Sequence, residues 1–315
     1  MSVVRIFFFS ALVLSAAIGA LAWFKKGDTG STAPVELPVA VVSTLAPLKP
    51  TPPVQEILEQ ASLPIASEPA QMDQIERLFA LDASKFPFVE TVSYTTRVPW
   101  LNGRAAWIAD YASHYETSRH FIARSLNRGP DYFSQKVSPG DRFNVFREGK
   151  KVEFLLLVNL TECRLSLYCI DASENERYLL KTYPVAVGKV DDSYESGFTT
   201  PTGKYSLGDK VAIYKPGTEG FFQDQKTEMI RVFGTRWMPF GQEIEGCSEP
   251  VKGLGLHGAP WVQDMATGQF VEDLSKLGKQ STDGCIHLAA KDIEEIFAIV
   301  LTKPTLVELT RGQTQ

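Results

Sequence analysis

Short apolar segments separated by turn residues fill the second half of this 315-residue chain and restrict the folds available to it. Residues 152–159 form an almost continuous apolar run, and residues 164–170 alternate apolar with other side chains after a Leu-Thr-Glu turn. Further strand-like segments follow at residues 179–187, 204–207, 229–233, 251–256 and 305–309. Short strands joined by polar, Gly or Pro turns are typical of a β-sandwich or a barrel-like domain. We therefore predict a mainly β domain over residues 151–315.

One helix interrupts this β-rich pattern near the C-terminus. Residues 292–301 place Ile293, Ile296, Phe297 and Val300 at helical spacing, so that the four side chains share one face. Pro304 follows directly, and proline ends a helix because it lacks a backbone N–H group. We expect this helix to pack its apolar face against the predicted strands.

The N-terminus carries an uncharged run at residues 6–24, preceded by Arg5 and followed by Lys25 and Lys26. At a rise of about 1.5 Å per residue, nineteen helical residues span roughly 28 Å, close to the hydrocarbon thickness of a bilayer. We predict a signal anchor or transmembrane helix over residues 1–26, with the remainder outside the cytoplasm. A signal peptide cleaved after Ala20 or Ala22 is the alternative.

Residues 27–70 contain eight of the nineteen prolines, with small and polar residues between them. Such a segment favours extended polyproline conformations and buries little surface, so we predict a linker. It either holds the folded part of the chain away from a membrane or is simply disordered filler. Sequence does not separate these two interpretations.

Residues 71–150 predict a small α+β module. A short amphipathic helix is expected just after residue 71, then a strand at 92–98 and a helix at 105–112. Thr117 or Ser118 is suited to cap a second helix that runs to Leu126. A Ser-Pro-Gly-Asp turn leads into a closing strand at 142–146.

Charge and cysteine content exclude some classes of protein. The formal net charge of −5 provides no basic surface for nucleic acid, so we expect no nucleic-acid partner. The four cysteines are too few for a dense disulfide framework, and their spacing does not fix any pairing. Nothing in the sequence sets the oligomeric state.

Two stretches carry the candidate chemistry, Leu-His-Gly-Ala-Pro at residues 256–260 and Ser-Thr-Asp-Gly-Cys-Ile-His-Leu at residues 281–288. A cysteine attacks a carbonyl as its thiolate, and an imidazole such as that of His257 takes the proton from Cys285. Gly284 allows close backbone approach, and its N–H group with that of Cys285 would point at a developing oxyanion. The competing interpretation is a buried structural cysteine beside a core histidine.

A metal site is a third interpretation of the same residues. Asp283, Cys285 and His287 alternate, so in an extended strand they share one face, and His257 would complete four ligands. The usual paired-cysteine spacing is missing, however, and the Gly-Cys step fits an oxyanion turn better. We predict no metal and no organic cofactor.

These stretches resemble the L,D-transpeptidase catalytic domain (YkuD-type) family. That family has a His-Gly step, then Ser/Thr-His-Gly-Cys followed by a hydrophobic residue and Arg or Asn. An upstream Thr-Pro-x-Gly and an aromatic-Pro segment complete the pattern. The matching residues are His257 and Gly258, then Thr282, Gly284, Cys285 and Ile286, with Thr-Pro-Thr-Gly at 200–203 and Trp237 opening Trp-Met-Pro-Phe at 237–240.

The chain departs from the family pattern at three points. Asp283 replaces the histidine before Gly-Cys, and His287 stands where the family has Arg or Asn. The spacer between His257 and Cys285 is longer than is common, which implies an inserted loop around residues 261–280. A neighbouring Asp raises the pKa of a thiol unless its charge is compensated, and we expect His287 to compensate it.

The resemblance implies a β-sandwich domain that joins peptidoglycan stem peptides through a cysteine acyl-enzyme, on the periplasmic side of a bacterial inner membrane. Cys285 would be the nucleophile and His257 the base. Gly284, Gly258, Asp283 and His287 would be auxiliary residues, and Trp261, Thr282 and Trp237 would line the substrate site. A peptidase of the same fold, a non-catalytic wall-binding protein and a zinc protein remain as alternatives.

The module at residues 71–150 resembles a degenerate LysM module, a family that binds cell-wall glycans. The resemblance rests on an Ile-Ala-x-x-Ala-x-x-Tyr helix at 108–115, Asn127 and the Pro-Gly-Asp turn. A small helical packing domain is the alternative. We interpret His114 and His120 as surface or packing residues. Three aromatic residues of the module, Trp107, Tyr111 and Tyr115, either stack on sugars or form its core.

Overall fold

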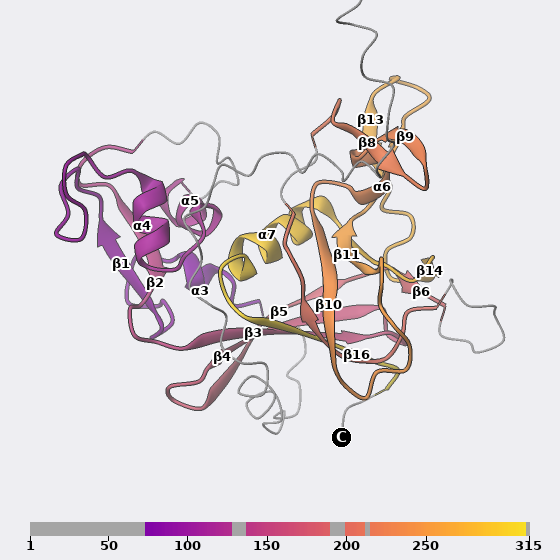
Figure 1. Ribbon diagram of the computed structural model, residues 1–315, viewed down its shortest axis with the longest axis horizontal. Helices are drawn as coiled ribbons and strands as arrows, with labels where there is room; N and C mark the ends of the chain where they lie inside the picture. The colour runs from indigo at the N-terminus through magenta and orange to yellow at the C-terminus, as the bar shows by residue number, and fades with distance from the viewer. Residues whose placement is uncertain (1–72, 128–136, 190–198, 212–214, 313–315) are drawn as a thin grey trace, which may run out of the picture. The chain divides into compact units, whose positions relative to one another are not determined.

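A computed structural model of the protein describes residues 73–127, 137–189, 199–211 and 215–312 (Figure 1). The chain divides into two units, Met1–Val41 and Val42–Gln315, and every described residue belongs to the second. The predicted anchor at residues 1–26 and the linker at residues 27–70 lie outside the described residues. Among the helices that are described, none has the length and apolar character needed to cross a bilayer.

The described residues from Val152 to Thr310, predicted above to form the catalytic segment, are built on one eight-stranded mixed sheet (Figure 1). Its strand order is β15-β11-β10-β7-β16-β3-β4-β5. The prediction of a mainly β domain is therefore confirmed. The strands are β3 (Val152–Asn159), β4 (Arg164–Asp171), β5 (Glu176–Pro184), β7 (Gly203–Leu207), β10 (Trp237–Glu245), β11 (Gly255–Gly258), β15 (Ile286–Leu288) and β16 (Thr305–Thr310).

The centre of this sheet is buried on both faces, which explains the unbroken apolar run of β3. Phe154, Leu156 and Val158 join the main core, whereas Leu155 and Leu157 point to a separate cluster on the opposite face. Alternate side chains of a strand point to opposite faces, so a strand covered on both sides has no polar positions in its middle. The sequence pattern and the burial agree here.

The sheet is curled rather than divided into the two separate sheets that the word sandwich implies. Pairing between β10 and β7 shifts register twice, between Phe240 and Glu243 and between Glu243 and Glu245. Such irregularities bend a strand and increase its twist. Ile244 near the end of β10 consequently packs with Leu155 and Leu157 on the second face. The two apolar layers thus belong to one folded sheet.

Helix α7 (Ala290–Val300) lies against the sheet, and its Ile293, Ile296, Phe297 and Val300 all enter the main core, as predicted. β16 then pairs parallel with β3 and antiparallel with β7, which brings the end of the chain into the centre of the sheet. Figure 1 shows α7 beside β11, which it contacts.

Two predicted strands are wrong. Residues 229–233 form a one-turn helix, α6 (Ile230–Phe233), which ends at Gly234 with φ +59°. A five-residue apolar run does not distinguish a strand from a buried helical turn, and the left-handed glycine decides here for the helix. The segment predicted at 251–256 is mostly turn, because β11 begins only at Gly255.

Three small two-stranded sheets surround the main one. The predicted strand at 179–187 divides into β5 and a short β6 at Val187–Gly188, and β6 pairs parallel with β14 (Gln280–Thr282). Two hairpins project from the domain. They consist of β8 (Glu219–Phe222) with β9 (Gln225–Glu228), and β12 (Trp261–Gln263) with β13 (Phe270–Glu272).

The N-terminal module has the predicted β-α-α-β order after the short helix α3 (Glu76–Phe79). Strand β1 begins three residues earlier than predicted and pairs antiparallel with β2. His114 stacks on Trp100 and His120 packs edge-on against Phe297, which confirms both as packing histidines. The remaining elements are β1 (Val89–Ser93), α4 (Ile108–His114), α5 (Arg119–Asn127) and β2 (Arg142–Phe146).

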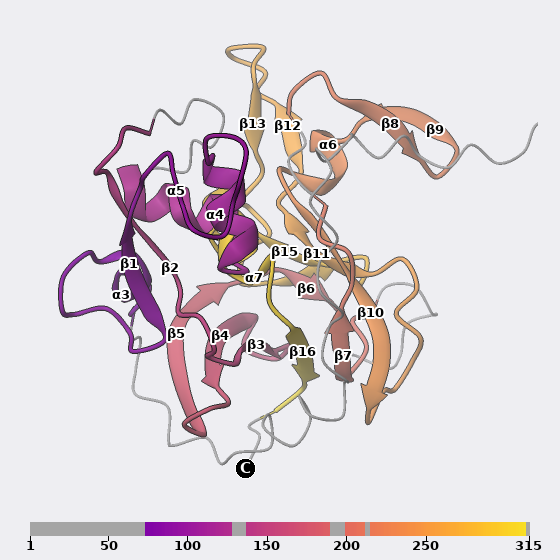
Figure 2. The ribbon, with the colours of Figure 1, turned by 60° about the vertical axis from the view of Figure 1, so that its left-hand side comes forward.

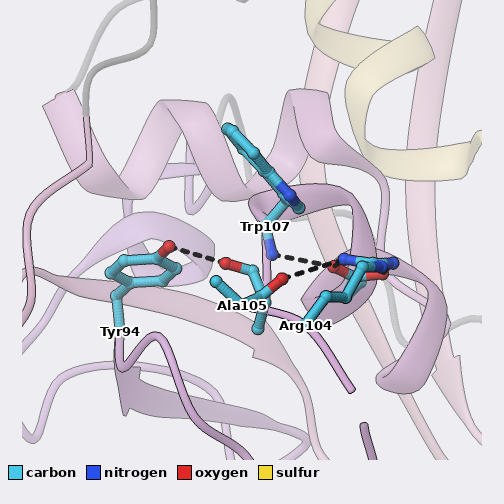
Figure 3. A network of polar contacts seen from close by, with 6 residues as sticks. Tyr94, Arg104, Ala105 and Trp107 are labelled. Carbon is cyan, nitrogen blue, oxygen red and sulfur yellow. Dashed lines mark hydrogen bonds and ion pairs between the residues drawn. The ribbon is translucent and has the colours of Figure 1, made fainter. Parts of the chain in front are cut away.

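Polar contacts fix the start of α4 (Figure 3). Asp110 accepts a hydrogen bond from the backbone N–H of Trp107 at 2.7 Å and forms an ion pair with Arg104 at 2.6 Å. The hydroxyl of Tyr94 donates to the carbonyl of Ala106. A carboxylate at this position satisfies a helix N–H group that has no partner inside the helix. Trp107 itself remains 66% exposed, whereas Tyr111 is in the core of the module.

The module and the catalytic segment share a core. Leu78, Phe121 and Phe146 belong to the same buried cluster as Phe154 and Phe297, while a second cluster around Tyr111 is the module's own. The domain boundary at residue 150 therefore stays a prediction, because apolar packing crosses it without a break.

Replacing Ser118 with Ala tests the contact between the two parts. Its hydroxyl accepts the N–H of Phe121 at 2.9 Å, as the predicted helix cap, and donates to the carbonyl of Ala298 in α7 at 2.5 Å. We expect Ser118→Ala to lower the free energy of unfolding by about 1–3 kcal/mol. Urea denaturation measures this, with the exposed Ser113→Ala as control; equal stability of the two variants would contradict the prediction.

Candidate active site

Strand pairing brings Cys285 and His257 to neighbouring positions, which sequence spacing alone does not show. β11 and β15 run parallel, with His257 paired to His287 and Leu256 to Ile286. Cys285 directly precedes β15, and the backbone of Gly255 hydrogen-bonds its thiol. Paired strands lie about 4.8 Å apart, so the thiol and the imidazole sit diagonally across one strand spacing.

No hydrogen bond joins the Cys285 sulfur to the His257 ring in the part of the chain that the structure describes. Catalytic hydrogen bonds are often long before substrate binds and shorten only in the complex.

The His257 ring is held in one tautomer. Its Nδ1 lies 2.9 Å from the carbonyl oxygen of Gly258, and a carbonyl only accepts, so Nδ1 carries the hydrogen. Nε2 is then the free acceptor of the neutral ring. Phe233 and Trp237 pack against the imidazole at 5.5 and 5.6 Å between ring centroids. Burial lowers the pKa of His257 to about 4, so the ring is neutral at pH 7.

His287 packs directly on His257, with ring centroids 4.2 Å apart. Burial, followed by the proximity of His257 and Lys276, lowers the pKa of His287 to about 2. The expectation that His287 compensates the charge of Asp283 is therefore wrong, because a neutral imidazole compensates no charge. Its Nδ1 is buried and has no hydrogen-bond partner in the described part of the chain.

The Cys285 thiol is also uncharged in the resting site. Burial raises the pKa of Cys285 to about 11, and Asp283 raises it further, while the hydrogen bond from the Gly255 backbone acts in the opposite direction. Asp283 is exposed to solvent. The effect predicted for an Asp two residues before a Cys is thus present, but burial is the larger cause. The resting pair is a neutral thiol beside a neutral imidazole.

Gly284 allows the backbone to turn sharply before the nucleophile. Its φ is +103°, and a Cβ added there would lie 2.9 Å from the carbonyl oxygen of Thr199. Any other residue would be strained and crowded at this position. This accounts for the Gly in the Gly-Cys step without reference to any family.

Side-chain hydroxyl groups hold both carbonyls of the Gly-Cys step. Thr200 Oγ1 donates to the oxygen of Gly284 at 2.9 Å and accepts the N–H of Gly188 at 2.8 Å. Thr282 Oγ1 donates to the oxygen of Cys285 at 2.5 Å. The N–H groups of Gly284 and Cys285 donate to no protein group that the structure describes. They are therefore available to a bound oxyanion.

Thr200 was not among the residues predicted for the site. Thr200 opens the Thr-Pro-Thr-Gly segment that the sequence analysis singled out, but the sequence did not reveal what its side chain does. Its side chain is fully buried, and it connects β6 to the loop that carries Cys285. The segment thus supports the site by positioning the nucleophile.

The remaining predicted site residues surround the two histidines. Gly258 packs closely on the backbone of α6's C-terminal turn, since a Cβ added to Gly258 would lie 3.0 Å from the backbone nitrogen of Thr235. Trp237 contacts His257, whereas Trp261 starts the β12–β13 hairpin and keeps a buried Nε1 without a described partner. The predicted inserted loop at residues 261–280 is this hairpin with the turn and strand that follow it (Figure 2).

The metal interpretation gains no support from the geometry. Within the described ranges, no group of three or more His, Cys, Asp or Glu side chains is arranged to hold a metal ion. Asp283 is exposed, while His257 and His287 are buried with their rings in contact.

Thr200→Val should destabilise the loop that carries Cys285, even though the two side chains are similar in size. The change removes one hydroxyl that serves two hydrogen bonds and leaves the buried Gly284 carbonyl unpaired, at a cost of about 1–3 kcal/mol. Thr202→Val, in the same segment, is the matched control because Thr202 uses only its backbone in hydrogen bonds. Thermal or urea denaturation compares the two. Equal stability of both variants would show that the Thr200 hydroxyl supports nothing.

The alkylation rate of Cys285 should depend on pH as expected for a thiol whose pKa is raised. We expect slow reaction with iodoacetamide at pH 7 and a rate that is still rising at pH 10, measured by peptide mass spectrometry. Removing a like charge lowers the pKa of the thiol, so Asp283→Asn should react faster at pH 8–9. A rate that levels off below pH 8 in the unmodified protein would contradict this.

Comparison with known proteins agrees with the geometry. The family model of the L,D-transpeptidase catalytic domain matches residues 153–309. No curated protein matches the chain.

Among solved structures, the helical cell shape determining protein Pgp2 from Campylobacter jejuni is 18% identical over 52% of this chain and 49% of that one, with a TM-score of 0.34. Bd1075 from Bdellovibrio bacteriovorus is 15% identical over 53% and 50%, with a TM-score of 0.32. This chain thus spans about half the length of the solved structures that it matches. From the family model and the motifs described above, residues 153–309 belong to the L,D-transpeptidase catalytic domain family.

Proposed function

We propose that the protein is a peptidoglycan L,D-transpeptidase that uses Cys285 as its nucleophile. The observation that carries this proposal is the tautomer of His257. Its Nδ1 hydrogen is fixed on the Gly258 carbonyl, so that Nε2 is a free base on the strand next to Cys285. The family to which residues 153–309 belong acts on peptidoglycan, which supports stem peptides as the substrate class.

In the first half-reaction, Cys285 attacks the carbonyl of the diamino acid in a donor tetrapeptide. The thiol proton passes to Nε2 of His257 as the S–C bond forms, and the same proton goes to the amine of the terminal D-alanine as its C–N bond breaks. The N–H groups of Gly284 and Cys285 stabilise the oxyanion formed on the attacked carbonyl. Loss of one such donor typically costs about 3 kcal/mol of transition-state stabilisation.

In the second half-reaction, the amine of a neighbouring stem attacks the thioester. His257 removes a proton from that amine and returns one to the departing sulfur, so the enzyme is restored unchanged. Asp283 at the rim, with an uncharged His287 nitrogen behind it, holds a cationic amine of the substrate. Trp237, Trp261 and Thr282 line the same region.

Burial of Cys285 and His257 determines at which step the thiol proton is transferred to the imidazole. With a pKa of about 11 for Cys285 and about 4 for His257, a preformed thiolate–imidazolium pair is disfavoured. Proton transfer is therefore coupled to attack on the bound carbonyl. A thiol that is unreactive until substrate arrives is protected from alkylation and oxidation.

The proposed setting is the periplasmic side of a bacterial inner membrane. The uncharged run at residues 6–24 would anchor the chain there, and the proline-rich linker at residues 27–70 would give the catalytic domain its reach. The module at residues 73–146 is proposed to contact the wall glycan, in keeping with its LysM-like order of elements.

Cys285→Ala should abolish formation of L,D cross-links by the purified protein on muropeptides, because no other group on β11 or β15 supplies a nucleophile. In the unmodified protein, intact-mass measurement should show a carbapenem adduct, which Cys285→Ala lacks and Cys247→Ala keeps. Cys247 is the matched control as a partly exposed cysteine away from β11 and β15. Undiminished cross-linking by Cys285→Ala would remove this thiol from the mechanism.

The acceptor distinguishes transpeptidase from peptidase. Incubation with a donor tetrapeptide alone and with added acceptor amine should give cross-linked product only in the second case. Release of the terminal residue at the same rate in both, without cross-links, would identify a peptidase. Sacculus binding without turnover and without an adduct would identify a non-catalytic wall protein.

A further inference from the structure

The groups described so far at the site offer no positive charge to an anionic group of a substrate. At pH 7 the thiol of Cys285 and the rings of His257 and His287 are all neutral, since their pKa values are about 11, 4 and 2. Asp283, which acts on Cys285, is negative. Any anionic group of a substrate therefore needs a cation from elsewhere, because the position where the family has Arg or Asn holds a neutral His287.

Among the described residues, Lys276 is a cationic side chain that acts electrostatically on His287, which packs on His257. It is exposed and forms no ion pair in the described part of the chain. Its acidic neighbour Asp273 already accepts two hydrogen bonds from Ser275, at 3.0 and 2.6 Å. Lys276 is thus a charge without a fixed partner at the edge of the site.

Backbone hydrogen bonds place the turn of Lys276 beside His287. Gly278 donates to Val185 at 3.0 Å, and Val187 donates to Lys279 at 3.1 Å. Between these two contacts, Ala186 exchanges two hydrogen bonds of 2.9 Å with the backbone of His287. The turn, the 185–187 segment and β15 therefore form adjoining rows. The position of Lys276 follows from the fold and does not depend on the conformation of its side chain.

We propose that Lys276 is a specificity-determining residue that binds the free carboxylate of the donor peptide's terminal residue. The proposal rests on the function proposed above and adds the group that recognises the leaving residue. That carboxylate lies one residue beyond the attacked carbonyl, a distance of about 4 Å between successive Cα atoms, which suits a lysine at the rim. Asp283 then binds the cationic amine of the donor peptide, and Lys276 binds its anionic terminal carboxylate.

This assignment gives the inserted segment at residues 261–280 a role in recognition. The segment supplies a cation through Lys276, whereas His287, at the position where the family has Arg or Asn, is neutral. A lysine presents a compact charge on a flexible stem, so it follows a small carboxylate without needing a rigid geometry. Because it is exposed, the attraction should weaken as ionic strength rises.

Equilibrium binding to full-length Cys285→Ala tests the proposal without requiring turnover. The probes are a donor tetrapeptide with a free terminal carboxylate and the same peptide as its C-terminal amide, titrated by calorimetry. We expect the acid to bind about tenfold more tightly than the amide at low salt, as for one charge-assisted contact. Adding Lys276→Met should lower the affinity for the acid to that for the amide, and Lys276→Arg should keep the preference.

Lys279→Met is the matched control, because Lys279 is an exposed lysine of the same turn that donates to the Ser275 carbonyl and does not act on the catalytic groups. It should keep the full preference for the acid. Equal affinity for acid and amide, or a preference that survives Lys276→Met, would overturn the assignment. Failure of the proposed function is a different result: the preference for the acid would be present while the protein with Cys285 intact forms no adduct and turns over neither peptide.

Discussion

The parallel pairing of β11 with β15 is the contact on which the site depends. The strands are only four and three residues long, and their register places His257 beside His287 and one step from Cys285. A slip of one residue would turn every side chain of β15 to the opposite face. Ala186 and Thr200 prevent this slip by fixing the backbone of His287 and the carbonyl of Gly284 from the other side.

Burial is the second constraint, because it determines the charge of every group in the site. The same desolvation that raises the pKa of Cys285 lowers the pKa of both histidines, so the resting site contains no ion pair between nucleophile and base. Oriented backbone dipoles, rather than charged groups, make the polar contacts inside the site. The Gly258 carbonyl orients the His257 ring, and the N–H groups of Gly284 and Cys285 have no acceptor among the described residues. Charges appear only at the rim, at Asp283 and Lys276.

Sequence reasoning predicted the mainly β fold and the C-terminal helix because each follows from local pattern, whereas the roles of Cys285 and His257 as nucleophile and base remain a prediction. β3 is apolar from Phe154 to Val158, as the middle of a strand buried on both faces requires, and α7 repeats its apolar residues at helical spacing. It failed at residues 229–233, where an apolar run too short to show a period is a helical turn. It also did not predict β10, whose Pro239 and Gly241 obscure the strand pattern.

At the site, too, local motifs predicted some features, whereas features that depend on residues distant in sequence were missed. Gly-Cys and His-Gly indicated a nucleophile, a base and an oxyanion turn, but the charge state of His287 depends on rings and burial that only the fold supplies. Thr200 was overlooked for the same reason, since its partner is 84 positions away in sequence. Lys276 stood in a segment predicted only as an inserted loop, and nothing in its local sequence connects it to His287.

The bond between Thr200 and Gly284 also has a consequence for how the protein folds. Contacts between residues far apart in sequence form late, because closing a long loop costs entropy before any contact is gained. The turn at Gly284 cannot be completed until Thr200 and Gly284, which lie 84 positions apart in sequence, have met. A partly folded chain therefore carries Cys285 without the burial that raises the pKa of its thiol, so the thiol becomes slow to react only in the folded molecule.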